Sequence, residues 1–234
     1  GLLGMTILST LLIPLNLACL YLIWQKARLI MRGSVWDNCK EIIMYKAKDI
    51  AKTFEDIAPI ESGIAGDELG FVYGDPDTQV TGLACLWNIH TQSLQACVDK
   101  NVNMIICHEH IWFTEQTSPW YEGPDKQEIY ANNERKKLLD QYGLVVYRSH
   151  SNWDALKHDG VADQAVLALG IDGVQTVASQ EFFSVQELPE EMSVAALHAH
   201  MEDGLGFSGC RIFGDGQKRI RKFAFLIGGF GENQ

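Results

Sequence analysis

The most chemically capable stretch of this sequence lies where an apolar run meets three polar side chains. A buried strand is predicted over residues 102–107, and it leads directly into the sequence His-Glu-His at 108–110. Imidazole and carboxylate groups are metal ligands, and they also act as general acids and bases. The segment therefore predicts either a metal site or an acid–base pair at the end of a strand.

A second apolar run ends in the same way further along the chain. A strand predicted over residues 144–149 is followed at once by His150 and then by Asp154. A helix is expected between a strand at 80–87 and the strand at 102–107, and such a βαβ connection makes its two strands parallel. Because ligands bind beyond the carboxyl ends of parallel strands, the polar residues at these strand ends are expected to form one site.

The order of the ligands suggests more than one metal ion. Adjacent strand residues point to opposite faces of a sheet, so His108 and Glu109 are not expected to bind one ion from an ideal strand. They can reach two ions, particularly where the strand breaks into a loop, and Asp154 is suited to bridge those ions. Two ions bridged by a carboxylate can share and activate one water. A mixed set of imidazole and carboxylate ligands suits zinc, manganese or iron.

Composition limits the classes of protein to which the chain can belong. It has 234 residues, enough for one large domain or two small ones, and a formal net charge of −11. So acidic a chain offers no basic stripe for phosphates, which argues against a nucleic-acid partner. Its 6 cysteines have no C-x-x-C spacing, and we expect a reducing compartment rather than a disulfide framework.

Alternating strand and helix patterns from residue 44 onward predict an α/β fold. Continuous apolar strands are typical of a parallel sheet covered on both faces, so we expect a mixed, largely parallel sheet with flanking helices. The expected strands lie at 71–73, 80–87, 102–107, 144–149, 176–179, 210–213 and 223–227. The expected helices lie at 46–57, 91–100, 126–142, 160–169 and 193–201.

The first 43 residues differ in character from the rest of the chain. Residues 2–24 are almost wholly apolar and uncharged, and basic residues follow them at 26, 28 and 32. That stretch can span a bilayer and would leave the remainder in the cytoplasm. Alternatively, the codons of Lys40 and Glu41 can form a purine-rich ribosome-binding site at the usual spacing before a start codon at Met44. In that case residues 1–43 would be translated upstream DNA, and the protein would start at Met44. We therefore expect a cytoplasmic protein, with a membrane-anchored form whose domain is cytoplasmic as the alternative.

Two segments together are similar to a known family. Residues 80–113 read VTGLACLWNIHTQSLQACVDKNVNMIICHEHIWF, and residues 148–170 read RSHSNWDALKHDGVADQAVLALG. This combination resembles the Nif-three-like family, whose members bind two metal ions and are often described as type 2 GTP cyclohydrolase I. The resemblance extends from Met44 to the C-terminus. It implies a two-lobed α/β fold and assembly as toroidal hexamers.

The resemblance also implies roles for individual residues. It implies metal ligands at His108 and Glu109, and it makes Asp154 the ligand that bridges the two ions. His150 would then act as an acid or base beside the ions instead of binding them. The family has a proline where this sequence has His110, so His110 either adds a ligand or alters the loop.

Two further departures from the family concern other parts of the chain. The family's segment Trp-Asp-Asn-x-Gly-Leu is matched only loosely, by residues 66–71. Family members also contribute a late His and Glu to the metals, and the sequence reaches Gln234 before such residues arrive. We therefore expect a Nif-three-like fold lacking its C-terminal portion. Its expected parts are an apolar segment at 1–43, a metal-site lobe at 44–172 and an incomplete second lobe at 173–234.

These features lead to two functional hypotheses. In the first, the protein is a metal-dependent hydrolase of the GTP cyclohydrolase type, in which two divalent ions activate water against a small-molecule substrate such as a nucleotide or phosphoester. In the second, it is a non-catalytic metal-binding protein with a regulatory or interaction role. Nothing in the sequence forms a phosphate-binding loop or reads guanine, so the substrate stays open. We expect a homo-oligomer, a hexamer by resemblance, and a membrane partner only if residues 1–24 are a genuine anchor.

Overall fold

The computed structural model describes residues 8–9, 45–112, 130–157, 159–180, 183–206 and 211–226. Contacts divide the chain into two compact units, of which the first ends at Asn152 and the second continues from Trp153. The sequence placed the boundary between lobes later, after residue 172. Within the described ranges, no helix is both long enough and apolar enough to cross a membrane. The anchor expected at 1–24 lies outside those ranges, apart from residues 8 and 9.

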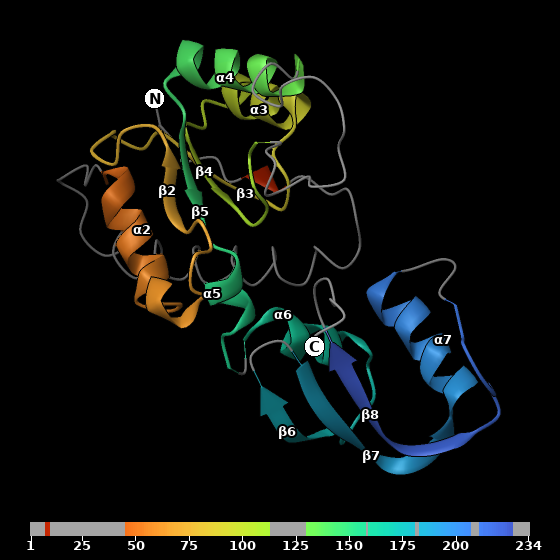
Figure 1. The fold of residues 1–234 in the computed structure, drawn as a ribbon. Helices are drawn as coiled ribbons and strands as arrows, with labels where there is room; N and C mark the ends of the chain where they lie inside the picture. The colour runs from red at the N-terminus through yellow and green to blue at the C-terminus, as the bar shows by residue number, and fades with distance from the viewer. Residues whose placement is uncertain are drawn as a thin grey trace, which may run out of the picture. The chain divides into compact units, whose positions relative to one another are not determined.

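The first unit is built on a five-stranded sheet with the strand order β1-β3-β4-β5-β2 (Figure 1). Its strands are β1 (Leu8–Ser9), β2 (Gly70–Tyr73), β3 (Leu83–Leu86), β4 (Met104–Cys107) and β5 (Val145–Arg148). The neighbours β1, β3, β4 and β5 run parallel, and β2 pairs antiparallel with β5. The expectation of an α/β fold with a mixed, largely parallel sheet is confirmed.

Helices cover both faces of this sheet (Figure 1). They are α2 (Ala47–Glu55) on one face and α3 (Thr91–Asp99) and α4 (Tyr130–Tyr142) on the other. The unit also includes the short 3-10 helix η1 (Ile60–Ser62) and the start of the short helix α5 (Ser151–Asp154). On one face, Leu94 of α3 and Leu139 of α4 share a core with Val146. On the other face, the hydroxyl of Tyr147 donates to Oε1 of Glu55 in α2 at 3.0 Å.

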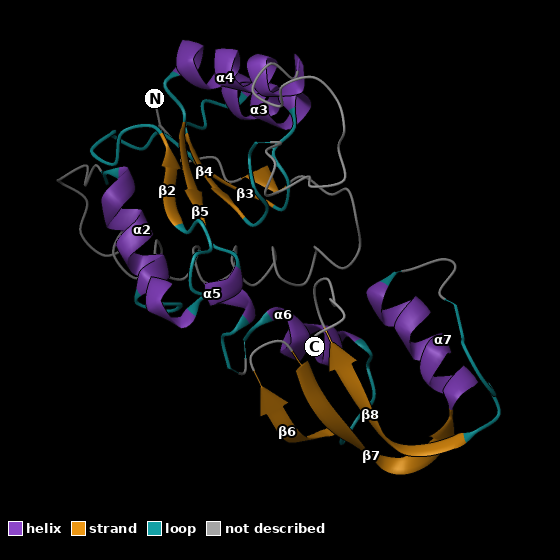
Figure 2. Cartoon of the chain, viewed as in Figure 1, coloured by secondary structure: helices purple, strands orange, loops and turns teal. Residues whose placement is uncertain are grey.

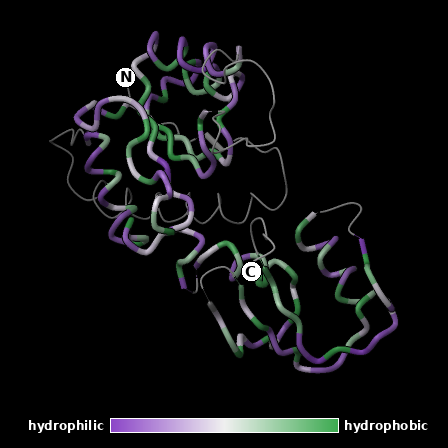
Figure 3. The backbone as a smooth tube through the Cα atoms, in the orientation of Figure 1, coloured by the Kyte–Doolittle hydropathy of each residue, from purple (hydrophilic) through white to green (hydrophobic). Residues whose placement is uncertain are grey.

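The strands β3, β4 and β5 are buried along their whole length. Figure 3 shows them as the hydrophobic centre of this unit. Because helices shield both faces from water, the strands read as unbroken apolar runs rather than as alternating ones. The free cysteines Cys85, Cys97 and Cys107 lie in this interior, where a thiol behaves as a small hydrophobic group.

Within the described residues, the second unit contains a three-stranded antiparallel sheet together with helices (Figure 2). Its elements are α6 (Val161–Ala168), β6 (Gln175–Gln180), β7 (Phe183–Ser193), α7 (Val194–Leu205) and β8 (Arg219–Leu226), with β7 central in the sheet. Ala165 and Leu169 pack with Leu197 and Leu205 in a small core between the helices and the sheet. The core is much smaller than that of the first unit.

The strands of the second unit differ from the sequence prediction. The strand β7 was not predicted, because its buried positions alternate through Ser184, Gln186 and Leu188, and two of these three side chains are polar. The strand expected at 210–213 is wrong at residues 211–213, which are exposed and irregular, and residue 210 lies outside the described ranges. The strand expected at 223–227 is present, but it begins earlier, at Arg219.

The predicted helices agree with the structure. Those expected at 46–57, 91–100, 160–169 and 193–201 are confirmed as α2, α3, α6 and α7, with shifts of a few residues at their ends. The helix expected at 126–142 is confirmed as α4 from Tyr130 onward, and its first residues lie outside the described ranges. The helix α5 was not predicted, because four residues are too few to show a period.

Candidate metal centre

The candidate site lies at the carboxyl end of the parallel sheet. The last residues of β4 and β5, Cys107 and Arg148, are paired in register. The backbone N–H of Ser149 still donates to the carbonyl oxygen of Cys107 at 2.9 Å, so the two strands separate only after this row. The residues that follow, His108 and His150, leave the sheet side by side, with 4.6 Å between their ring centroids. The parallel arrangement thus brings the two strand-end motifs together.

Three side chains converge just beyond this edge. Among the described residues, ligand atoms of His108, Glu109 and His150 all lie within 4.8 Å of one another. Two ligands held about 2.1 Å from one ion are separated by at most about twice that distance, so the group is close to the size that an ion requires. Two imidazoles and one carboxylate form a donor set that suits zinc, manganese or iron. The residues present therefore fit a divalent metal ion.

The side chains of His108 and Glu109 point to the same place although they are adjacent in sequence. The Nδ1 atom of His108 lies 3.5 Å from Oε1 of Glu109. Strand alternation would separate them, but β4 has ended at Cys107 and the chain bends at residues 108 and 109. On an ideal strand these two side chains would be expected to reach different ions, whereas here the strand breaks into a loop and both side chains can reach one point.

Aromatic contacts hold His108 in place. The indole of Trp87, which follows β3, stacks on the His108 ring with 3.7 Å between centroids and 14° between the planes. The imidazole of His150 meets the same ring edge-on, at an interplanar angle of 73°. The side chain of His108 is only 11% exposed, so packing restricts its rotamers. A ligand that is fixed in advance loses less side-chain entropy when it binds a metal.

The electrostatics favour the protonation states that bind metal. The neighbouring His108 ring lowers the pKa of Glu109 below its usual value, which keeps that carboxylate ionised. Burial lowers the pKa of His150, which keeps its imidazole neutral near pH 7. Metal binding requires a carboxylate that is ionised and an imidazole that is neutral, so neither group has to lose a proton first.

A buried network lies behind His150. The Oδ2 atom of Asp67 is 2.7 Å from Nδ1 of His150 and accepts a 2.6 Å hydrogen bond from the hydroxyl of Ser151. The Oδ1 atom accepts a 2.6 Å hydrogen bond from Nη1 of Arg148. Burial alone would raise the pKa of Asp67, but the hydrogen bonds from these partners hold it well below its usual range. Asp67 is therefore an ionised carboxylate.

Sequence reasoning missed Asp67 and Arg148. The side chain of Arg148 is fully buried, and it also donates from Nη1 to the carbonyl oxygen of Glu68 at 2.6 Å and from Nε to that of His108 at 3.0 Å. It thereby joins the loop before β2 to the end of β4. Two signals pointed to the pair: an arginine ends an otherwise apolar strand, and Asp67 lies in the segment that matches a family motif loosely.

Comparisons with known proteins agree with this geometry. Residues 45–233 match the Duf34/NIF3 (NGG1p interacting factor 3) family. The chain belongs to the Duf34/NIF3 family. A protein of Clostridium acetobutylicum named GTP cyclohydrolase 1 type 2 homolog is 28% identical to it over 193 residues, which are 78% of this chain and 68% of that relative. The Nif-three-like resemblance of the sequence is confirmed.

Solved structures share the fold of this NIF3-family chain. A hypothetical protein of Staphylococcus aureus is similar with a TM-score of 0.67 at 17% identity, covering 82% of this chain and 74% of the other. A Bacillus cereus protein related to NIF3 is similar with a TM-score of 0.65 at 14% identity, covering 80% and 77%. At such identities the likeness shows the fold alone, which is the mixed α/β fold of the family.

The structure brings together three of the four site residues predicted for this NIF3-family chain. His108 and Glu109, predicted as ligands, lie with His150, predicted as an acid or base. Asp154, predicted as the bridging ligand, is half-buried at the end of α5 and is not part of this group of described residues. Its bridging role stays a prediction, as does the proton-transfer role of His150.

His110 stands where the NIF3 family has a proline, and it lies outside the group of three. Its Nδ1 atom is 3.4 Å from Oε2 of Glu68, and the two side chains are 33% and 57% exposed. An exposed pair of this kind contributes little to stability. The position favours an altered loop over an additional ligand in the group.

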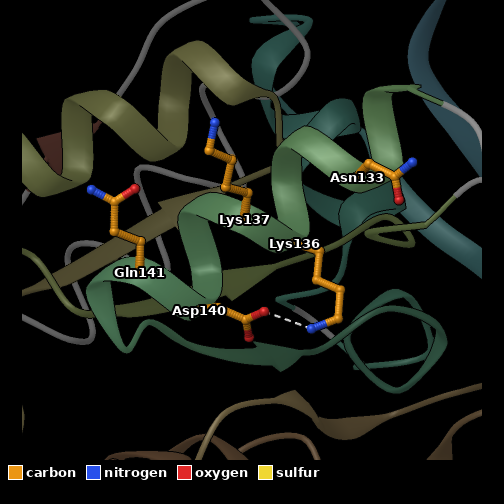
Figure 4. Close-up of a pocket in the computed structure, with 5 residues that line it drawn as sticks. All are labelled: Asn133, Lys136, Lys137, Asp140 and Gln141. Carbon is orange, nitrogen blue, oxygen red and sulfur yellow. Dashed lines mark hydrogen bonds and ion pairs between the residues drawn. The ribbon is translucent and has the colours of Figure 1, made fainter.

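A hollow of about 600 Å³ lies along α4, and none of its lining residues belongs to the group (Figure 4). Its lining residues all come from one exposed helix face and are Asn133, Lys136, Lys137, Asp140 and Gln141. Lys136 and Asp140 pair there at 2.6 Å, as surface residues four positions apart on a helix commonly do. This open, solvated face holds no convergent set of metal ligands, and we assign it no part in the site.

Proposed function

We propose that this NIF3-family protein is a metal-dependent hydrolase whose metal centre includes His108, Glu109 and His150. The observation that carries the proposal is the convergence of their ligand atoms, all within 4.8 Å of one another, beyond the carboxyl edge of the sheet. The family resemblance adds Asp154 as a ligand that bridges two ions of zinc, manganese or iron. Such ions supply Lewis acidity and lower the pKa of water toward neutrality.

The three side chains of the centre differ in their exposure to solvent. The side chain of Glu109 is 38% exposed, compared with 11% for His108 and 28% for His150. A substrate would therefore approach on the side of Glu109. Trp87 and His150 cover the ring of His108, which keeps water away from that side of the group.

The proposed substrate is a small molecule, a nucleotide or another phosphoester. Support comes from curated relatives in two Clostridium species that carry the name GTP cyclohydrolase 1 type 2 homolog. The proposal also includes a homo-oligomer, a hexamer by family resemblance. Size-exclusion chromatography with light scattering measures the mass of the particle, and a mass equal to that of one chain would contradict this part.

The central experiment measures metal content and GTP turnover on the same purified protein. We expect two ions per chain by elemental analysis and release of a product from GTP. Glu109→Gln keeps the size of the side chain but removes its charge, and it should lose both metal and turnover. Glu187→Gln is the matched control, because Glu187 pairs with Lys222 on the surface of the second unit at 3.2 Å. One ion per chain would contradict a bridging Asp154, and absence of metal would refute the centre.

A non-catalytic metal-binding protein is the second candidate. The description of the family, NGG1p interacting factor 3, names an interaction rather than a reaction. A regulatory or interaction protein could use the same three side chains to hold an ion that only stabilises the fold. Stoichiometric metal without turnover of GTP, other nucleotides or phosphoesters would favour this candidate over the hydrolase.

A further inference from the structure

Along β7, the two faces of the sheet β6-β7-β8 carry the reverse of the usual distribution of side chains. Ser184 and Gln186 are each 1% exposed, and Phe223, the β8 partner of Gln186, packs against the core formed by α6 and α7. Because successive side chains alternate between faces, Phe183 and Val185 lie on the other face. When one face of an antiparallel sheet is in water, its side chains are usually polar. This outer face departs from that pattern.

The strands β7 and β8 lie side by side (Figure 1), and their cross-strand pairs on the outer face are Phe183 with Leu226, Val185 with Ala224, and Glu187 with Lys222. The first two pairs are wholly apolar, and Leu226 is 46% exposed. Ala224 is also exposed, as is Ala178 of β6, which pairs with Val185 on its other side. A contiguous apolar surface that is open to solvent marks a site of interaction.

The charges of the outer face allow it to meet a second copy of the chain. The chain has a formal net charge of −11, so two copies repel one another on average. On the outer face, however, the carboxylate of Glu187 lies 3.2 Å from Nζ of Lys222 and 3.5 Å from Nε of Arg221. A surface that carries both signs side by side can pair with its own image, because each charge then meets its opposite.

The three cross-strand pairs are also matched in size and polarity under two-fold symmetry. An isologous contact brings the same patch of both copies together. A two-fold axis that is parallel to the strands, midway between β7 and β8, places each β7 position opposite its β8 partner in the facing copy. The contacts across the axis then join two large apolar side chains, a larger and a smaller apolar side chain, and two opposite charges: Phe183 with Leu226, Val185 with Ala224, and Glu187 with Lys222.

We propose that the outer face of β7 and β8 packs against the same face of a second copy about a two-fold axis of this kind. Two sheets that pack face to face lie about 10 Å apart and keep their strands roughly aligned, as this axis requires. The proposal rests on the homo-oligomer of the proposed function and assigns it an interface. It does not depend on the metal centre.

Cross-linking of the wild-type protein tests the contact between Glu187 and Lys222 of different copies. A carbodiimide joins a carboxylate to an amine without a spacer. Chains labelled with nitrogen-15 are incubated with unlabelled chains until native mass spectrometry shows mixed oligomers, and they are then cross-linked. We expect linked peptides of which one is labelled and the other is not. Lys48 and Asp77 are the internal control, because they pair within one chain at 2.6 Å and should give links of a single label.

A charge placed in the middle of the interface should separate the copies. In Val185→Lys an ammonium group would be buried opposite Ala224, so the dissociation constant of this contact should rise at least about tenfold in sedimentation velocity. Adding Ala224→Glu to the same chain supplies a facing carboxylate and should restore the contact. Leu167→Lys is the matched control, since Leu167 is 69% exposed on α6 and its replacement should leave the mass of the particle unchanged.

Two results would overturn the proposal, and they differ in what they imply for the oligomer. A wild-type protein that sediments as one chain at every concentration would refute both the homo-oligomer and its interface, leaving the outer face to a different protein. A wild-type oligomer that gives only single-label links between Glu187 and Lys222 would refute this interface alone. If circular dichroism shows that Val185→Lys does not fold, the cross-links of the wild type decide the question.

Discussion

Removing the guanidinium of Arg148 should destabilise the first unit strongly. Arg148→Met keeps a long apolar side chain but leaves the carboxylate of Asp67, which is 9% exposed, without its buried partner. Breaking a buried ion pair by removing one member costs about 3–5 kcal/mol, because the remaining charge stays buried and uncompensated. The carbonyl oxygens of Glu68 and His108 lose a donor as well.

Urea unfolding followed by circular dichroism measures this loss. For a slope of about 2 kcal/mol per molar urea, the midpoint should fall by about 1.5–2.5 M. The double variant Arg148→Met with Asp67→Asn removes both charges, and it should be more stable than Arg148→Met alone. Lys52→Met is the control, since Lys52 and its partner Asp56 are 73% and 64% exposed, and the midpoint should hardly change.

Two results would refute the reasoning about this pair. A midpoint for Arg148→Met that is indistinguishable from the wild type would mean that the guanidinium is not buried in the folded protein. A double variant whose loss equals the sum of the two single losses would mean that the charges of Arg148 and Asp67 do not interact.

Three other measurements address the metal, the buried thiols and the packing of the second unit. Excess zinc should raise the midpoint of thermal unfolding in calorimetry, and a chelator should reverse the rise, because a ligand of the folded state stabilises it. Burial raises the pKa of Cys97 from 9.0 to about 11 and that of Cys85 to about 12. The thiols then ionise first in the unfolded state, so stability should fall as the pH rises from 9 toward 11, and less steeply in Cys97→Ala. A Cβ at Gly204 would lie 1.9 Å from the carbonyl oxygen of Ala168, so Gly204→Ala should cost about 1–3 kcal/mol in urea, whereas Gly216→Ala, with nothing nearer than 3.8 Å, should be neutral. A midpoint that does not change with zinc would contradict the first expectation. Equal pH dependence of stability in the wild type and Cys97→Ala would contradict the second, and equal stability of the two glycine variants would contradict the third.

In the first unit, the helices α2, α3 and α4 and the strands β2, β3, β4 and β5 could be predicted because most of their buried side chains are apolar, whereas β7 in the second unit could not. The side chains of Ser184 and Gln186 are buried in β7, and they are hydrogen-bonded to each other at 2.8 Å. The hydroxyl of Thr176, on the neighbouring β6, donates to Oε1 of Gln186 at 3.0 Å. Polar side chains can be buried when they form hydrogen bonds with one another, and a hydropathy pattern does not reveal such burial.

Some residues of the candidate site could be predicted from the sequence, and others could not. His108 and Glu109 were predicted because residue type and position at a strand end are both readable from the sequence. Asp67 was not, because its partner Arg148 is 81 positions away along the chain. The two meet because β2 pairs antiparallel with β5 and places Gly70 opposite Arg148, which carries the loop before β2 to the edge of the sheet. Pairing between distant strands is a property of the fold and not of any local pattern.

The position of Arg148 in the sheet is explained by the site rather than by stability. Leu86, Cys107 and Arg148 form one row across β3, β4 and β5, the last row before the candidate metal centre. Apolar side chains of similar volume often stabilise an interior as well as a buried ion pair does. A leucine in place of Arg148 would pack in this row, but it could neither donate to the carbonyl oxygen of His108 nor hold the carboxylate of Asp67. Arg148 is thus a buried cation that interrupts the apolar sequence of its strand. Such departures from the local pattern are expected at functional sites.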